Sequence, residues 1–454
     1  MKTFRAVVGG TVIDGTGAPG RPGWTVLIEG NRIRSVHPDG SVELPEGVEI
    51  IDAHGCHVIP GLMDANVHVT GANTTELMLQ YESDYSPLID EGLQIALRAG
   101  VTTVFDTAGI LDVLVAARER VENGSLVGSR LFLAGQIIGF PEAFGPDAEG
   151  QASGIFGPDT TARLAPRLDR GVNAELVRMA PDEVRAHVRE YIETSGIDFV
   201  KYAACTHIDP AQAIPYITFS EAAQRAIVEE GHRAGLTVQA HTMSPESLRM
   251  EIEAGADILQ HGSITGNRPL PDETLEVIVE RQLPVAALLP NERYHTWMEA
   301  YGPEPRRSYA FNRILQANNR RLIEAGARLL LTTDGFVEGS HVRSHPAWSS
   351  LLDGAVDSPW KLGEGHFLWL EAVTEMGMAP MEVLLSGTRY IAEAYQQPEL
   401  GTLEPGKRAD LLVLDGDPLR DVRAYRRIVQ IVKDGTRIDR SSLPTRRIVS
   451  DPDH

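Results

Sequence analysis

An asparagine and a histidine two residues apart close an apolar stretch near the start of the chain. The segment VIPGLMDANVH begins at Val58 and ends with Asn66 and His68. If the apolar run 58–63 is a strand that continues to His68, both side chains lie on one side of it, because side chains alternate along a strand. An amide oxygen and an imidazole nitrogen could then meet at one metal ion. Taken alone, however, such a pair is more often structural.

Four later segments repeat the pattern of an apolar strand that ends in a residue able to bind or bridge a metal. These residues are Lys201, His241, His261 and Asp334. Segments rich in Ala, Glu and Arg, such as 220–234 and 316–325, separate the strands and are typical of helices. Strands that alternate with helices predict a parallel sheet. Ligand-type residues at the ends of successive strands predict a (β/α)8 TIM-type barrel with its site at the carboxyl-terminal face.

The two ends of the chain carry short predicted strands separated by glycine and proline turns. They are expected at 6–8, 24–29 and 32–36 near the start, and at 410–414 and 428–433 near the end. Neither end has enough strands to bury a core alone, so we expect both to form one composite β-sandwich. The expected division is 1–57 and 397–454 for the sandwich and 58–396 for the barrel.

Composition limits the partners and the compartment. A chain of 454 residues can hold a barrel and a smaller module. The formal charge of -21 argues against nucleic acid or an anionic membrane as a partner. Cys56 and Cys205 are too few for a disulfide framework, which favours a reducing compartment. No run approaches the roughly 18 apolar residues of a membrane span, and no signal peptide is evident, so we expect a cytoplasmic protein.

The barrel motifs resemble those of the metal-dependent amidohydrolase superfamily. PGLMDANVH, FVKYA, QAHT, LQHGS and TTDG occur in the family's order, and the tail GTLEPGKRADLLVLDGDPL is similar to its closing segment. The resemblance covers essentially the whole chain. The family's first motif normally reads His-x-His, so Asn66 is a departure, and Asn-x-His resembles the phenylurea hydrolase subgroup.

The resemblance implies a ligand set for one or two metal ions. It assigns Asn66, His68 and Asp334 to one metal and His241 and His261 to the other, with a carboxylated Lys201 between them. A lysine ammonium has no lone pair, so Lys201 could bind only after losing its proton, or as a carbamate formed with carbon dioxide. Imidazole and carboxylate donors suit zinc, manganese or cobalt better than calcium or magnesium. An amide oxygen is a weaker donor than imidazole, so a form with one metal also stays open.

The expected activity is hydrolysis of a non-peptide C–N bond. The first candidate substrate is an N-aryl urea, which would give an aniline and a carbamate that decomposes to an amine and carbon dioxide. An amidase, a carbamate hydrolase, a prolyl dipeptidase or a non-enzymatic scaffold with a degenerate site are the alternatives. Hydrolysis needs an activated hydroxide, a polarised carbonyl and an acid for the departing nitrogen, and Asp334 is the expected proton carrier. The resemblance also implies a homo-oligomer.

Residues in the loops after the strands could contact a small aryl substrate. The candidates are Tyr294, His295, Trp297 and His345. Packing of these loops on themselves explains the same residues equally well. The Gly-rich and Pro-rich stretch 139–170 could be a lid or simply an insertion.

Overall fold

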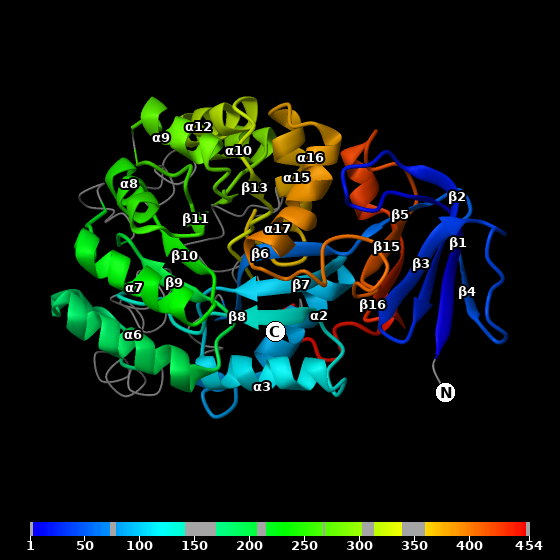
Figure 1. The fold of residues 1–454 in the computed structure, drawn as a ribbon, viewed down its shortest axis with the longest axis horizontal. Coiled ribbons are helices and arrows are strands. Elements are labelled where there is room, and N and C mark those ends of the chain that lie inside the picture. Colours follow the sequence, from blue (N-terminus) through cyan, green and yellow to red (C-terminus); the bar gives the residue numbers. More distant parts are fainter. Residues whose placement is uncertain are drawn as a thin grey trace.

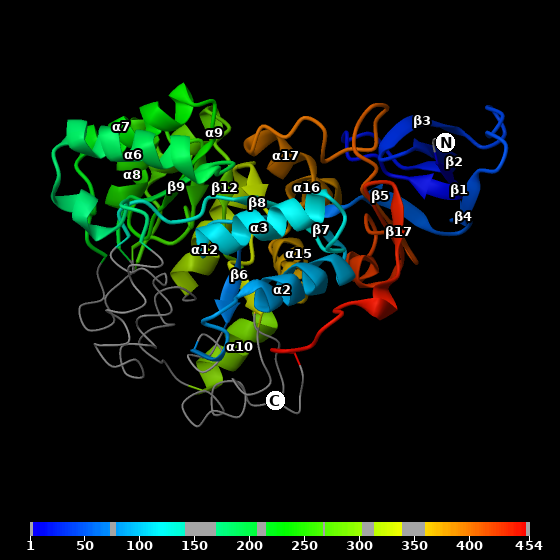
Figure 2. The same cartoon turned by 90° about the horizontal axis from the view of Figure 1, so that it is seen from below.

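The computed structural model describes residues 3–72, 79–140, 169–206, 215–266, 268–301, 313–337 and 359–450. A barrel and a separate terminal sheet lie side by side in two perpendicular views (Figures 1 and 2). Within the described residues, no helix is both long and apolar enough to cross a membrane.

Parallel strands form the barrel in two connected sheets. One sheet has the order β13-β12-β11-β10-β9 and the other the order β14-β6-β7-β8. Their bounds are β6 (Leu62–Ala72), β7 (Val101–Asp106), β8 (Arg130–Leu133), β9 (Val200–Ala203), β10 (Val238–His241), β11 (Ile258–Gln260), β12 (Val285–Ala286), β13 (Leu329–Leu330) and β14 (Gly335–Val337). β13 pairs with β12, and β14 pairs with β6. The short strands β13 and β14 therefore act as one interrupted strand between β12 and β6. The other two edge strands are β8 and β9. A parallel bridge between Ile138, which follows β8, and Tyr202 of β9 joins them, and the predicted barrel is confirmed.

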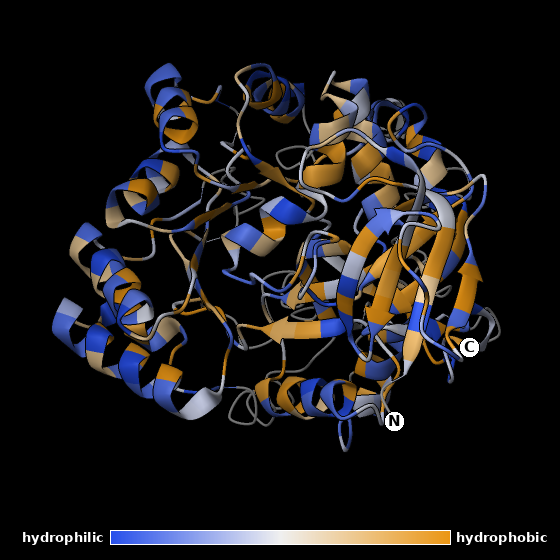
Figure 3. Cartoon of the chain, turned by 45° about the vertical axis from the view of Figure 1, so that its right-hand side comes forward, coloured by the Kyte–Doolittle hydropathy of each residue, from blue (hydrophilic) through white to orange (hydrophobic). Residues whose placement is uncertain are grey.

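Helices cover the outside of the barrel (Figure 1). They are α2 (Ser86–Arg98), α3 (Leu111–Glu122), α6 (Pro181–Ser195), α7 (Glu221–Arg233), α8 (Pro245–Ala254), α9 (Asp272–Glu280), α10 (Glu292–Tyr301), α12 (Arg313–Glu324), α15 (Gly365–Glu375), α16 (Pro380–Ser386) and α17 (Arg389–Ala394). The Ser220 hydroxyl accepts from Ala223 N and caps α7, while α6 begins at a proline and ends at Gly196 with φ 65°. The helices carry both hydrophobic and hydrophilic residues, as expected when one side packs on the strands (Figure 3).

Both ends of the chain build the terminal sheet, as the sequence predicts. Its order is β17-β16-β15-β5-β1-β2-β3, with β4 paired to β1. The bounds are β1 (Phe4–Val12), β2 (Arg21–Glu29), β3 (Arg32–Pro38), β4 (Glu49–Asp52), β5 (His57–Pro60), β15 (Leu411–Leu414), β16 (Ile428–Lys433) and β17 (Thr436–Ile438). The sheet has its own apolar core, to which both ends contribute, for example through Val26, Val58 and Val413.

The single strand predicted over 58–63 is wrong. The segment contains two strands, because β5 pairs with β1 and β15 in the terminal sheet, whereas β6 pairs with β7 in the barrel. The change occurs at Pro60 and Gly61. Proline has no amide hydrogen to donate, and a Cβ at Gly61 would lie 2.2 Å from Thr102 Oγ1, so the strands approach here as only glycine allows.

A buried arginine joins the barrel to the terminal sheet. Arg130, on β8, forms ion pairs with Asp410, just before β15, and with Asp434, just after β16. The Arg130 side chain is 12% exposed. Although burial alone would lower the pKa of Arg130, the two carboxylates raise it. The arginine therefore stays charged and holds the two modules together.

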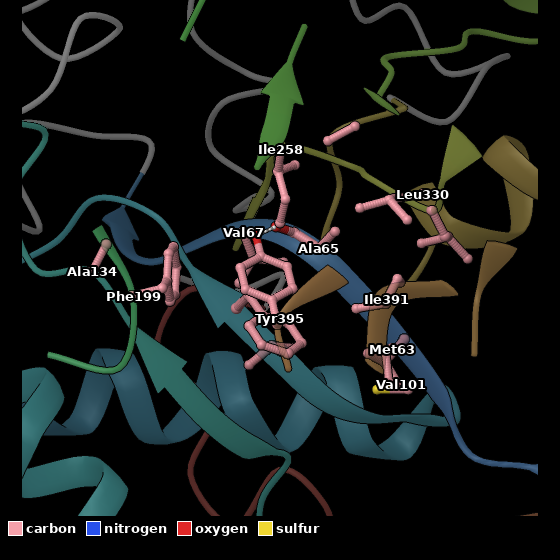
Figure 4. Close-up of a cluster of buried hydrophobic side chains, with 14 of the residues drawn as sticks. Met63, Ala65, Val67, Val101, Ala134, Phe199, Ile258, Leu330, Ile391 and Tyr395 are labelled. Atoms are coloured by element: carbon pink, nitrogen blue, oxygen red, sulfur yellow. Dashed lines mark hydrogen bonds between the residues drawn. The ribbon is translucent and has the colours of Figure 1, made fainter. Parts of the chain in front are cut away.

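Tyr395 and Phe199 belong to a cluster of buried hydrophobic side chains that includes Ala65 and Val67 of β6 (Figure 4). Tyr395 stacks on Phe105 with ring centroids 3.8 Å apart and meets the edge of Phe199 at 4.9 Å. Its hydroxyl donates to Ala65 O at 2.6 Å. This contact fixes β6 directly before Asn66, where the polar end of the strand begins.

Candidate metal centre and active site

The end of β6 brings Asn66 and His68 to Asp334. Pairing of β6 with β7 is irregular between Asp64 and Val67, where three steps on β6 match two on β7. Such a bulge redirects side chains and is common next to active sites. Asn66 Nδ2 donates to Asp334 Oδ1 at 2.5 Å, and His68 Nε2 lies 3.1 Å from the same oxygen. Three of the predicted site residues therefore lie together.

His261 lies near the other oxygen of Asp334, and His241 packs against His261. The two rings meet edge to face with centroids 5.0 Å apart. His261 Nε2 lies 4.0 Å from Asp334 Oδ2. The carboxylate thus stands between His68 and His261, with a different oxygen directed to each.

Asp334 and His261 both have a left-handed backbone, with φ of 55° and 63°. This conformation is uncommon for any residue except glycine, although Asp and His adopt it more often than most, and it is frequent at functional sites. Surrounding hydrogen bonds hold it in place: Asp334 N donates to Asn66 O at 2.9 Å, and His261 N donates to Ala286 O at 2.8 Å. Asp64 adds to this support by accepting from Thr333 N at 3.1 Å and from its hydroxyl at 2.5 Å.

The ring of His68 lies between two acceptors. Its Nδ1 is 3.1 Å from Ala108 O, opposite the contact of Nε2 with Asp334. Burial lowers the pKa of His68, but the hydrogen bond to Asp334 and its charge outweigh burial and raise that pKa to about 9. With Nδ1–H donated to Ala108, the neutral ring would present the Nε2 lone pair to a metal.

Lys201 is a buried amine near the same carboxylate. It is 2% exposed, and burial lowers its pKa to about 7, against the opposing charges of Asp334 and Glu251. Burial would raise the pKa of Asp334, but His261, His68 and Lys201 together hold it well below its usual range. Lys201 is the second residue of β9 rather than its last, because β9 continues to pair with β10 as far as Ala203 and His241.

Two residues at the end of β7 belong to the site but are absent from the predicted set. Asp106 is fully buried and its Oδ2 accepts from Val69 N at 2.7 Å; burial raises the pKa of Asp106 to about 7. Thr107 is also fully buried, and its hydroxyl donates to Asn66 Oδ1. The sequence carries a signal for them, since VTTVFDT is another apolar strand ending in polar residues.

The predicted substrate residues are only partly described. Tyr294 and His295 are each 1% exposed, and the Tyr294 ring meets Trp360 edge to face at 5.8 Å. They lie on helix α10 rather than in the expected loop, because Asn291 Oδ1 accepts from Tyr294 N and caps the helix. The Trp297 side chain, His345 and residues 141–168 of the predicted insertion lie outside the described residues.

The donor types around Asp334 fit a divalent metal. In the part of the chain that the structure describes, no three His, Cys, Asp or Glu side chains are arranged to hold an ion as they stand. Asp334 is instead hydrogen bonded to Asn66 and His68. Imidazole nitrogens on both sides of one carboxylate are nevertheless the donors preferred by zinc, manganese and cobalt.

Comparison with known proteins shows a matching family and similar solved structures. The model of the amidohydrolase family matches residues 57–438, and this family generally uses divalent metal ions. The structure of molinate hydrolase superposes with a TM-score of 0.90 at 36% identity, covering 99% of this chain and 97% of that one. Phenylurea hydrolase B superposes with a TM-score of 0.91 at 32% identity, covering 99% and 100%.

More distant sequences include other hydrolases. Ochratoxinase from Aspergillus niger is 24% identical over 384 residues, which are 81% of this chain and 72% of that protein. Imidazolonepropionase from Salinispora arenicola is 25% identical over 422 residues, 90% of this chain and 89% of that protein. The chain therefore belongs to the amidohydrolase family, and it is an enzyme that hydrolyses C–N bonds other than peptide bonds in small molecules.

Proposed function

We propose that this enzyme hydrolyses N-aryl ureas, releasing an aniline and a carbamate that decomposes to an amine and carbon dioxide. The observation that carries the proposal is the meeting of Asn66 and His68 at Asp334. Its second support is the likeness to phenylurea hydrolase B at 32% identity over 99% of this chain. Likenesses to prolidases at lower identity support the fold alone.

The proposed metal is zinc, with manganese and cobalt as the other candidates. The residues proposed to hold it are His68, His241, His261 and Asp334, with Lys201 as a carbamate bridge if two ions bind. When bound, the metal would polarise the urea carbonyl and bring the pKa of a water molecule towards neutrality. The position of Lys201, buried within the electrostatic reach of Asp334, supports its part in this set.

Asp334 is the proposed proton carrier. Its carboxylate lies among the proposed metal ligands, where it can accept a proton from the attacking water. The oxygen of that water bonds to the carbonyl carbon, and the bond from this carbon to the aryl nitrogen breaks. The nitrogen leaves with the electron pair and takes the proton from Asp334. In the structure, His68 lies near one oxygen of this carboxylate and His261 near the other.

Molinate is the second candidate substrate, because the likeness to molinate hydrolase reaches 36% identity over nearly the whole chain. Amides and carbamates remain alternatives that the same residues could hydrolyse. The homo-oligomer and the cytoplasmic location expected from the sequence stay predictions.

The test is a substrate panel on purified protein reconstituted separately with zinc, manganese and cobalt. An N-aryl urea, its matched anilide, its matched carbamate and molinate are compared, and aniline or amine release is measured. We expect the urea to be hydrolysed fastest, with loss of turnover after chelation and recovery when metal is returned. Turnover of another member alone would refute the urea assignment. Full activity in protein shown by elemental analysis to be metal-free would refute the mechanism.

A further inference from the structure

Both ends of the Asn66 amide have partners inside the protein. Asn66 Oδ1 accepts from the Thr107 hydroxyl, and Asn66 Nδ2 donates to Asp334 Oδ1 at 2.5 Å. Asn66 is 1% exposed and Thr107 is fully buried, so solvent cannot replace either contact. The three side chains form one hydrogen-bond network, Thr107–Asn66–Asp334. It runs from the end of β7 through β6 to the residue before β14.

The partners also decide which end of the amide is the nitrogen. An ionised carboxylate only accepts hydrogen bonds, whereas a threonine hydroxyl can donate or accept. Turning the amide over would place its oxygen 2.5 Å from Asp334 Oδ1 with no proton between the two acceptors. The orientation with nitrogen towards Asp334 satisfies all three groups.

Backbone hydrogen bonds also hold together the three segments that carry this hydrogen-bond network. Asp334 N donates to Asn66 O at 2.9 Å, and Thr107 N donates to Val67 O at 3.1 Å. The side chains therefore have little freedom to exchange partners. Holding Oδ1 from the β6 side leaves Asp334 Oδ2 directed towards His261 at 4.0 Å.

We propose that Asn66 and Thr107 are positioning residues for Asp334, and that Asn66 is not a metal ligand. Thr107 fixes the amide, the amide nitrogen holds Oδ1, and Oδ2 is left for the metal and the moving proton. This reverses the role that the sequence predicts for Asn66. The inference rests on the proposed function, since a metal site at Asp334 gives the positioning its purpose.

Threonine variants test the Thr107–Asn66–Asp334 hydrogen-bond network without changing a proposed metal ligand. Thr107→Val replaces the hydroxyl by a methyl group of similar size, and Thr107→Ser keeps the hydroxyl. Thr102→Val is the matched control. Thr102 lies on β7, near the end opposite Thr107, is 1% exposed, and its hydroxyl donates to Leu62 O at 3.3 Å.

We expect Thr107→Val to lower kcat about tenfold, within the range for loss of a group that orients a metal shell, with KM and the metal Kd nearly unchanged. Thr107→Ser and Thr102→Val should stay close to the wild type in all three quantities. The metal Kd is measured by competition with a chelator. If kcat of Thr107→Val equals that of Thr102→Val, or if Thr107→Ser does not keep the wild-type kcat, the hydrogen-bond network does not position Asp334.

A crystal structure of the metal-loaded wild type gives a readout independent of turnover. The amide of Asn66 should remain within hydrogen-bonding distance of Asp334 and outside the metal shell. An amide oxygen about 2.0–2.2 Å from the metal would overturn the inference while leaving the proposed function intact. A wild type that binds no metal would overturn both.

Discussion

Substitutions of Asp334 can separate its chemistry from its backbone conformation. Asp334→Asn would keep the shape of the side chain and tolerate the left-handed φ of 55°, but could not carry the proton. Asp334→Gly would keep only the backbone freedom. Asp334→Ala would lose the carboxylate and also place a Cβ in a conformation that costs about 1–2 kcal/mol for ordinary residues.

The structure sets an order for the metal-free stabilities. The side-chain oxygen introduced by Asp334→Asn can still accept from Asn66, whereas Asp334→Gly leaves that buried donor unpaired at about 1–3 kcal/mol. Asp334→Ala should be less stable than Asp334→Gly by about a further 1 kcal/mol, because only glycine is free of left-handed strain. The free energy of unfolding is therefore expected to be highest for the asparagine variant, lower for the glycine variant and lowest for the alanine variant.

Turnover should respond differently from stability. All three variants lose the proton carrier, so kcat should fall by about 100-fold to 10,000-fold in each, the usual contribution of general acid–base catalysis. Urea unfolding of the metal-free proteins and aniline release by the metal-loaded proteins measure the two effects. An Asp334→Asn enzyme with more than about a tenth of wild-type kcat would refute the proton role. Equal stability of the glycine and alanine variants would refute the backbone argument.

Three further predictions concern other parts of the molecule. Lys201→Ala should abolish turnover, and short carboxylic acids added in solution should partly restore it by replacing the carbamate; an unmodified lysine directed away from the metal in crystal density would contradict this. Arg130→Met should lower the free energy of unfolding by about 3 kcal/mol, because two aspartates lose a buried partner, and a loss below about 1 kcal/mol in urea unfolding would contradict the joining role. Burial lowers the pKa of His366 from 6.5 to about 3, with the charge of Arg426 acting in the same direction, so the unfolded chain takes up a proton below pH 6.5 that the folded protein refuses until about pH 3. The wild type should therefore lose up to about 1.4 kcal/mol per pH unit from this group between those values, and His366→Gln should show a shallower acid decline in unfolding experiments.

The barrel could be predicted because its strands are buried on both faces. Continuous apolar runs such as 285–290 and 329–331 are typical of parallel strands covered by helices. The same property explains the error at 58–63. An apolar run records burial but not the hydrogen-bonding partner, so it could not show that β5 belongs to the terminal sheet and β6 to the barrel.

The chemistry of the site was predictable in residue type but not in orientation. Histidine and aspartate at strand ends have few alternative uses, whereas a threonine hydroxyl such as that of Thr107 is unremarkable in a sequence. Asparagine carries both a donor and an acceptor. Which of them faces the site depends on partners 41 and 268 residues away along the chain, and only the fold brings these together.

Asn66 departs from the His-x-His motif, and its contacts are those of a residue in a working site rather than of a lost metal ligand. A residue left behind by decay has no reason to satisfy its polar atoms, yet both ends of the buried Asn66 amide are hydrogen bonded. Asp334 and His261 also have left-handed backbones, which cost more stability for them than for glycine and are typical of functional sites. Glycine would adopt these conformations without strain, but it would supply neither a carboxylate nor an imidazole. The presence of these two residues beside a fully hydrogen-bonded Asn66 argues that β6, β7 and the segment before β14 position side chains for catalysis.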